Sequence, residues 1–250
     1  MDDDRKVSLM VGFEISGVPS EGGVLIVADH ASNDLPDDID LAIGPEYLDD
    51  HIAFDPGTAP IARLMSENSG YLAILSATSR LVVDLNRYPD EPSAIPLRSD
   101  GVAIPGNLIS MEEREARMAR FFQPYHDRID ALIADLKPAL VLSLHSFTPT
   151  LRTRPGLVRP WDIGILYNHY ETASRLALQF LEAEGVLNVG DQLPYSGKEL
   201  NATMDRHCET VGQPYFGAEL RQDLIMDPVG QRRFADILLR TCDKIRTALA

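Results

Sequence analysis

The sequence predicts an α/β fold, a three-layer α/β/α sandwich around a mixed, mainly parallel sheet, in one domain over residues 1–250. Strand-like and helix-like segments alternate along the chain, which is typical of a sheet covered by helices on both faces. The strand-like run Val24–Ala28 is continuously apolar, as expected of a strand buried on both faces. No internal repeat, low-complexity tract or linker divides the chain.

In the first half of the chain, apolar runs predict strands and capping residues predict helices. Thr58 can cap a helix that has Pro60 in its first turn and ends near residue 69, before Gly70. The Pro-rich stretch 88–109 is predicted as a long loop, which in a compact domain is usually functional or disordered. The elements expected before this loop are one short strand within residues 1–23, strands over 24–28, 71–76 and 81–85, and helices over 45–50 and 58–69.

In the second half, Ser110 and Glu113 form a capping box that opens a long helix, whose apolar residues recur up to Pro138. A strand then runs into His145. The last helix, Pro228–Leu249, has one apolar face. The other expected elements are strands over 163–167 and 215–220, helices over 171–184 and 201–211, and loops over 146–160 and 190–197.

The charge and the composition argue against several classes of protein. A net charge of -15 opposes binding to nucleic acid or to an anionic membrane surface. A run of about 18 apolar residues, as a membrane span needs, does not occur. The charged N-terminus lacks an apolar signal core, and the two cysteines fit neither a disulfide framework nor a paired metal motif. We therefore expect a cytoplasmic protein, in which a locally basic pocket can still bind a small anionic substrate.

Two predicted buried strands each end in a histidine. His30 follows the run Val24–Ala28 by two residues, and His145 ends the apolar run 141–144. Ligands collect at the carboxyl edge of strands in open α/β sheets, so we expect the two side chains to meet there and to bind one metal ion. The alternative for each is a histidine with a structural hydrogen bond at the sheet edge.

A catalytic zinc usually has three protein ligands and one position for water, so two histidines need a third partner. Asp55, before Pro56 and Gly57, is the first choice, with Asn33 and Asp29 as competitors. The alternative for Asp55 is a turn-forming residue before Pro-Gly. Iron, cobalt or manganese would also suit a site of this composition.

Other polar residues near strand ends are candidates for chemistry. Glu219 could act as a general base on a metal-bound water, or could simply pair with Arg221. Arg87 offers a planar fork for a carboxylate, and Arg80 could stabilise an oxyanion. An arginine in such a position, taken alone, more commonly forms a surface ion pair than a functional contact. His126 is interpreted as structural, and His51, His169 and His207 have no partner that the sequence identifies.

Five segments resemble the N-formylglutamate amidohydrolase family, in the order in which that family has them. They span most of the chain, roughly residues 20–245, and together are far more specific than any one of them. The family is similar in fold to the zinc carboxypeptidases and the aspartoacylase-like deacylases. The segments are DHASN (29–33), SRLVVDLNR (79–87), LHSFTP (144–149), RPW (159–161) and ELRQDL (219–224).

The resemblance implies a role for each matching residue. His30 and His145 correspond to the first and last zinc ligands, and Glu219 to the general base. Arg80 corresponds to the arginine that polarises the scissile carbonyl. Zinc carboxypeptidases have a Glu three residues after the first His, where this chain has Asn33, so the middle ligand differs and Asp55 is proposed for it. The residues expected to hold the substrate's carboxylates are Asn86, Arg87, Arg159 and Arg221.

The implied function is hydrolysis of the amide bond of an N-formyl or N-acyl amino acid, such as N-formylglutamate, by a zinc-activated water. One alternative is a carboxypeptidase-like peptidase or an esterase on the same metal site. Another is a non-catalytic carboxylate-binding protein. A serine hydrolase is disfavoured because the sequence has no Gly-x-Ser-x-Gly elbow, and no nucleotide-binding motif is present.

Overall fold

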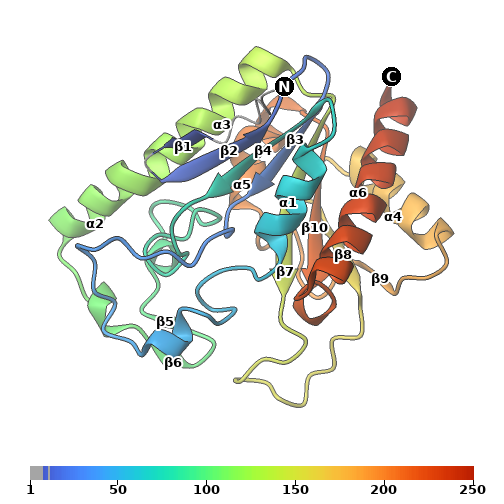
Figure 1. Cartoon of the computed structure of the whole chain (residues 1–250). Coiled ribbons are helices and arrows are strands. Elements are labelled where there is room, and N and C mark those ends of the chain that lie inside the picture. The colour runs from blue at the N-terminus through green and yellow to red at the C-terminus, as the bar shows by residue number, and fades with distance from the viewer. Residues whose placement is uncertain (1–7, 11) are drawn as a thin grey trace, which may run out of the picture.

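The centre of the structure is a mixed sheet of eight strands in the order β1-β2-β4-β3-β7-β10-β8-β9 (Figure 1). The computed structural model describes residues 8–10 and 12–250. The four central strands are parallel to one another, and both edges add antiparallel pairings. The strands are β1 (Ser8–Met10), β2 (Phe13–Gly17), β3 (Val24–Ala28), β4 (Tyr71–Ser76), β7 (Leu140–Phe147), β8 (Ile163–Leu166), β9 (Val189–Asp191) and β10 (Tyr215–Arg221).

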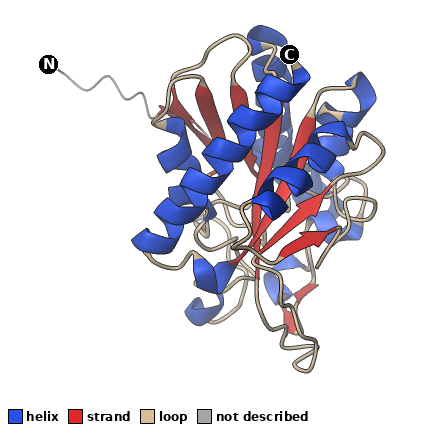
Figure 2. Cartoon of the chain, turned by 90° about the vertical axis from the view of Figure 1, so that its right-hand side faces the viewer, coloured by secondary structure: helices blue, strands red, loops and turns tan. Residues whose placement is uncertain are grey.

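Helices cover both faces of the sheet, which confirms the predicted three-layer α/β/α fold (Figures 1 and 2). Ile26 of β3 packs into a core with one set of helices, and Leu25 and Val27 pack into a second core on the other face. The first set is α1 (Thr58–Ser66), α4 (Thr172–Ala183) and α6 (Pro228–Leu249). The second is α3 (Gln123–Leu136), α5 (Ala202–His207) and the π-helical turn that precedes α3, whereas α2 (Met111–Arg117) has no buried residue. None of the helices described is long and apolar enough to cross a membrane.

Short elements complete the chain. The π-helical turn η4 (Met118–Phe122) joins α2 to α3, so the predicted long helix forms in three consecutive segments. The hairpin of β5 (Arg98–Ser99) and β6 (Val102–Ala103) stands apart from the main sheet. The 3-10 turns are η1 (Pro45–Tyr47), η2 (Pro92–Ala94), η3 (Pro105–Asn107), η5 (Glu209–Val211) and η6 (Gln222–Leu224).

Most predicted elements are confirmed, with shifts at their ends. The Ser110–Glu113 capping box is present. The second helix is capped by Gly57 rather than Thr58, which is its first helical residue, and it ends at Ser66. The segment expected to be one helix over 201–211 divides into α5 and η5, and part of the expected loop 190–197 belongs to β9.

The predicted strand over residues 81–85 is wrong. Leu81 and Val82 are fully buried, which explains the apolar run, but the backbone pairs with no strand. The carbonyl of Leu81 accepts a 2.8 Å hydrogen bond from the Asn107 side chain, and the amide of Asp84 donates to Ala94 at 2.8 Å. A buried loop whose backbone groups find such partners avoids the cost of unpaired polar groups without joining a sheet.

A substitution at Gly57 would test whether the turn before α1 leaves room for a side chain. It has φ = 86°, and a Cβ there would lie 2.5 Å from the carbonyl oxygen of Ile225. We expect Gly57→Ala to lower the free energy of unfolding by about 2–4 kcal/mol, because a left-handed backbone and a steric clash add together. Gly185→Ala, at φ = 67° with open space around the position, should cost only about 1 kcal/mol. Denaturant titration measures both, and equal losses would contradict the predicted clash.

Candidate active site

The three residues predicted as metal ligands come from three separate segments at the carboxyl end of the central strands. His30 follows β3, His145 lies near the end of β7, and Asp55 precedes the turn into α1. The backbone amide of Asp55 donates to the carbonyl of His30 at 2.8 Å, and the carbonyl of Asp55 accepts from the Thr58 hydroxyl at 2.7 Å. Asp55 therefore forms the turn and is also held beside His30.

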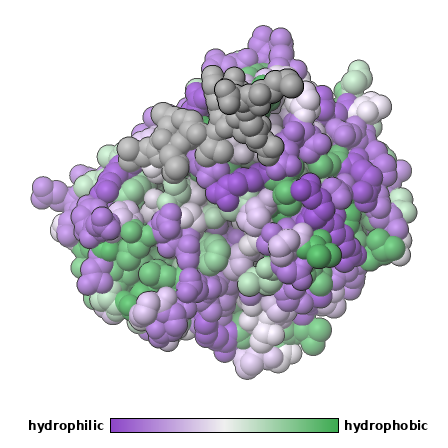
Figure 3. All heavy atoms as spheres, in the orientation of Figure 1, coloured by the Kyte–Doolittle hydropathy of each residue, from purple (hydrophilic) through white to green (hydrophobic). Residues whose placement is uncertain are grey.

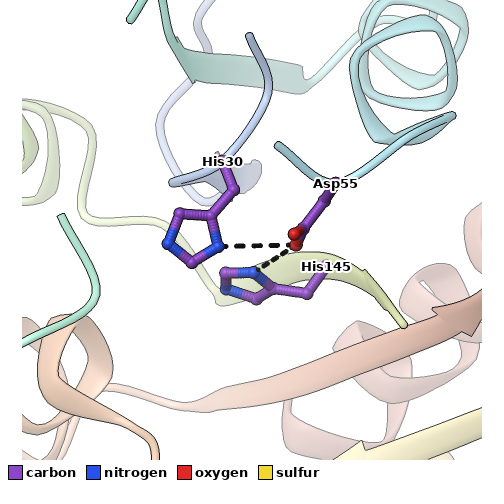
Figure 4. A group of neighbouring side chains, drawn as sticks. All are labelled: His30, Asp55 and His145. Carbon is purple, nitrogen blue, oxygen red and sulfur yellow. Dashed lines mark hydrogen bonds and ion pairs between the residues drawn. The ribbon is translucent and has the colours of Figure 1, made fainter. Parts of the chain in front are cut away.

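The side chains of these three residues converge (Figure 4). One carboxylate oxygen of Asp55, Oδ2, lies 2.9 Å from Nδ1 of His145 and 3.5 Å from Nδ1 of His30. Potential ligand atoms of the three residues all lie within 4.8 Å of one another, and all three residues are buried. Two imidazole nitrogens and one carboxylate oxygen are a donor set that suits zinc.

The far nitrogen of each histidine faces a second carboxylate. Nε2 of His30 lies 2.8 Å from Oδ1 of Asp84, and Nε2 of His145 lies 3.5 Å from Oδ2 of Asp29. The hydroxyl of Tyr125 on α3 donates to Asp29 at 2.9 Å. Metal-ligating histidines commonly have a carboxylate behind them, which fixes the ring and makes it a stronger ligand.

Neither competitor for the third ligand lies between the histidines. Asp29 is the carboxylate behind His145. The side chain of Asn33 instead donates to the carbonyl of Leu48 at 3.0 Å and to Asp49 at 3.2 Å. The structure therefore brings Asp55, rather than Asn33 or Asp29, into the position of a third ligand.

Arg80 links two of the buried carboxylates. Its Nη2 and Nε donate to Asp84 at 2.7 and 3.2 Å, and its Nη1 donates to Oδ1 of Asp55 at 3.3 Å. This contact occupies one oxygen of Asp55 and leaves the other facing the histidines. Three of the five guanidinium N–H groups are thus engaged, and Arg80 still lines the cavity described below.

The charges of the cluster fit a divalent cation. Three buried carboxylates, those of Asp29, Asp55 and Asp84, face one guanidinium, which leaves two negative charges when both histidines are neutral, as metal ligands are. Burial alone would lower the pKa of His145, but hydrogen bonds to Asp29 and Asp55 raise it well above its usual value. Nδ1 of His30 is buried and has no hydrogen-bond partner. A cation would balance the charge and give this nitrogen a partner, so the residues present fit a metal ion.

Glu219 lies beside the cluster on the neighbouring strand. It is the register partner of His145, and both side chains point to the face that α3 covers. Burial, with a contribution from the Asp55 carboxylate, raises the pKa of Glu219 to about 7. Its Oε2 is buried without a hydrogen-bond partner. The same face of these two strands carries Ser143 and Gly217, whose small size leaves room for a cavity.

Asn86 and Arg87 line the cavity with donors that are not committed elsewhere. Oδ1 of Asn86 accepts from the amide of Thr203 at 3.0 Å, and its side-chain NH₂ has no hydrogen bond to any residue of the described chain. The nearest carboxylate to Arg87 is that of Asp84, 3.8 Å from its Nε. Both side chains can therefore donate to a ligand, and their predicted contact with the substrate stays a prediction.

The two other predicted substrate-binding arginines lie behind or outside the cavity. Arg159 is buried and donates to the carbonyl of Thr148 at 3.0 Å and to the hydroxyl of Tyr195 at 3.1 Å. It meets the cavity only through these residues, which line it. Arg221 lies at the end of β10 and pairs with Asp223 at 2.8 Å and with backbone carbonyls of loop 160–161. The position of Arg221 does not support substrate binding.

Nothing in the sequence assigns Tyr195 or His51 to the cavity, which both residues line. Tyr195 lies in the expected loop 190–197, where no motif distinguishes it. The two ring nitrogens of His51 lie 2.7 Å from Asp50 and 3.2 Å from Asp100, which is on the β5–β6 hairpin. No local pattern signals a contact between segments so far apart in the sequence.

Comparison with known proteins identifies the family of the chain. The family model for N-formylglutamate amidohydrolase matches residues 22–226. A structure of a gene product from Agrobacterium tumefaciens is 32% identical, with a TM-score of 0.88 and 95% of each chain covered. An N-formylglutamate amidohydrolase from Ralstonia eutropha is 16% identical and shares the fold, with a TM-score of 0.68 over 96% of this chain and all of that one. No curated protein matches the sequence significantly. The extent of the family match shows that the chain belongs to the N-formylglutamate amidohydrolase family, whose members are amide-bond hydrolases.

Proposed function

We propose that the chain is a metal-dependent amidohydrolase that cleaves small anionic N-formyl or N-acyl amino acids, with N-formylglutamate as the first candidate substrate and zinc as the first candidate metal. One observation carries the proposal. The unpartnered carboxylate oxygen of Glu219 lies beside the His30–Asp55–His145 cluster, in a cavity that Asn86 and Arg87 line with free donors. A base, a metal site and a carboxylate-binding site therefore share one cavity.

The cluster of His30, Asp55 and His145 would hold the metal ion. When bound, such an ion supplies a Lewis acid and lowers the pKa of a water molecule to about 7. Glu219 would accept the proton of the attacking water and later donate it to the leaving amine. Its buried position suits this exchange, because a pKa of about 7 lets the carboxyl group both take and release a proton near neutral pH.

Two side chains can stabilise the negative charge that develops on the carbonyl oxygen. Arg80 retains two unengaged N–H groups at the cavity. Tyr195 accepts a hydrogen bond from Arg159, so its own hydroxyl proton remains available for donation. Preorganised donors of this kind stabilise an oxyanion strongly in a site that excludes water. Arg159 would thus act through Tyr195 rather than by direct contact with the substrate.

Asn86 and Arg87 would bind the substrate's carboxylate. An amide NH₂ and a guanidinium can together hold both oxygens of one carboxylate. This contact would fix the amide bond of the substrate relative to Glu219 and the metal site. It would also select N-acyl amino acids over neutral amides, because a substrate without the carboxylate would leave these donors unpaired.

Metal content is the first test of the proposal. We expect purified protein to hold about one divalent ion per chain, since the site offers three protein ligands. Asp55→Ala and His145→Ala should lose the ion, while His169→Ala, at an exposed histidine, should retain it. Added zinc should raise the melting temperature of the wild type and of His169→Ala but not of the two ligand variants, because a ligand stabilises the state that binds it. A wild-type protein that binds no metal by either measurement would contradict the proposal.

Glu219→Gln tests the general base. It should lower kcat by about 10²–10⁴-fold, because the amide cannot accept the proton, and leave metal content unchanged. Glu199→Gln, on the exposed surface, is the matched control and should retain full activity. Because the carboxylate form is required, kcat/KM of the metal-loaded wild type should fall on the acid side, with a midpoint below the pKa of about 7 that burial gives Glu219 without a cation. An active Glu219→Gln enzyme would rule out this role.

Arg87→Gln tests the carboxylate site. We expect KM for N-formylglutamate to rise about tenfold or more, as loss of a charge-assisted hydrogen bond would give. The effect should be much smaller with the same substrate in which the α-carboxylate is replaced by an amide. Equal effects on both substrates would show that Arg87 does not contact that carboxylate.

Cleavage of peptides but not of formyl-amino acids by the wild type would instead indicate a peptidase.

A further inference from the structure

Two buried histidines outside the metal cluster form a pair under the face of the sheet that carries the cavity. His126 lies on α3 and His207 ends α5. Nδ1 of His126 is 2.8 Å from Nε2 of His207, and the rings are inclined by only 19°. The geometry is that of a hydrogen bond between two imidazoles. The role that we assigned to the cavity does not use either residue.

Both ends of this pair meet groups that only accept hydrogen bonds. Nε2 of His126 is 3.0 Å from the carbonyl oxygen of Leu85. Nδ1 of His207 is 2.6 Å from the carboxylate of Asp130. A carbonyl and an ionised carboxylate have no proton to donate, so the histidines must supply one to each end. The result is a chain of three hydrogen bonds through two rings.

A count of protons gives the charge of the pair. Two neutral imidazoles carry one N–H each, whereas three hydrogen bonds require three protons. All three bonds form only if the pair holds one additional proton. Burial lowers the pKa of both imidazoles, that of His126 to about 3, and the Asp130 carboxylate opposes this effect at His207. A neutral pair would leave one of the buried nitrogen contacts without a proton, which is costly.

Charged side chains around the histidine pair also affect whether it holds the additional proton. Asp130 on α3 and Asp29 after β3 favour the extra proton, while Arg206 on α5 opposes it. The hydroxyl of Tyr125, next to His126, is engaged with Asp29. The two carboxylates oppose the effect of burial, which still lowers the pKa of both imidazoles. The three hydrogen bonds, rather than the neighbouring charges, therefore require the extra proton.

The pair is connected directly to the proposed carboxylate site. The carbonyl of Leu85, which His126 contacts, also accepts from the hydroxyl of Thr203 at 3.3 Å. The backbone amide of Thr203 holds Oδ1 of Asn86 at 3.0 Å. Leu85 and Asn86 immediately precede Arg87 and belong to a segment with no strand partner. Contacts from α3 and α5 therefore fix this segment where a sheet does not.

We propose that His126 and His207 share one extra proton and, in this protonated state, position Asn86 and Arg87 to bind the substrate's carboxylate. They are positioning residues, since they act through Leu85 and contact no substrate. The kinetic part of this inference rests on the proposed function, whereas the protonation state of the pair does not. Loss of the extra proton would remove one hydrogen bond and loosen the segment.

Nitrogen-15 NMR of histidine-labelled wild type tests the proton count without any assay of activity. At pH 7 we expect three of the four ring nitrogens of His126 and His207 to carry a proton. Asp130→Asn keeps an acceptor but removes the charge, so the extra proton should leave at a lower pH than in the wild type. This variant is expected to fold, because the Asp130 side chain is 58% exposed. Two protonated nitrogens in the wild type at pH 7 would overturn the shared proton.

Kinetics test the positioning role with whichever N-acyl amino acid the wild type cleaves. His126→Gln, His207→Gln and Thr203→Val should raise KM by about tenfold, as loss of a hydrogen bond would, with kcat and metal content nearly unchanged. Preference for the substrate over its carboxyl-amide analogue should fall in parallel, which general destabilisation would not cause. His169→Gln is the control. Unchanged KM and preference in folded variants would overturn the positioning role, and a wild type without amidase activity would instead contradict the proposed function.

Discussion

The arrangement of the candidate active site depends on one buried oxygen atom, Oδ2 of Asp55. It lies between the near nitrogens of His30 and His145, two residues that are far apart in the sequence and meet only because β3 and β7 pair in the sheet. A buried carboxylate without partners would be strongly destabilising. The histidines, the amide of Ser146 and the guanidinium of Arg80 all compensate it. Each of these contacts also fixes the direction in which Asp55 presents its free electron pairs.

The pairing of β7 with β10 places the other residues of the candidate site next to the residues that Asp55 contacts. Parallel register places Glu219 directly beside His145, and side-chain alternation turns both toward the face covered by α3. The small residues Ser143 and Gly217 lie one step earlier on the same face of the same two strands. Bulk at either position would fill the space that a substrate needs. The proposed base, His145 and the cavity thus follow from the pairing of β7 with β10, whereas His30 is brought in by the pairing of β3 with β7.

Sequence patterns predicted the parts of the fold that depend on local periodicity. Apolar runs located β3, β4, β7 and β10, and the parallel pairing of β3 with β7 explains why His30 and His145 could be expected to meet. The same signal failed at residues 81–85, because burial alone does not distinguish a strand from a loop held by side chains such as Asn107. Asp55 could only be ranked among alternatives, since its contact depends on the turn at Gly57. Tyr195 and His51 reach the cavity through loops that carry no periodic signal.

Electrostatic charge links the two proposed binding events, that of the cation and that of the anionic substrate. The whole chain carries a net charge of -15, and the cluster at His30, Asp55 and His145 has an excess of two buried negative charges when both histidines are neutral. An anionic substrate would therefore be repelled from the cavity by Asp55 and Glu219 as long as no cation balances them. Arg87 lines the same cavity and attracts an anion, but Asp84 lies 3.8 Å from its Nε and weakens this attraction. Binding of the cation and of the substrate should consequently be coupled, with the cation the first to enter, because it removes the repulsion that the substrate's carboxylates would otherwise meet.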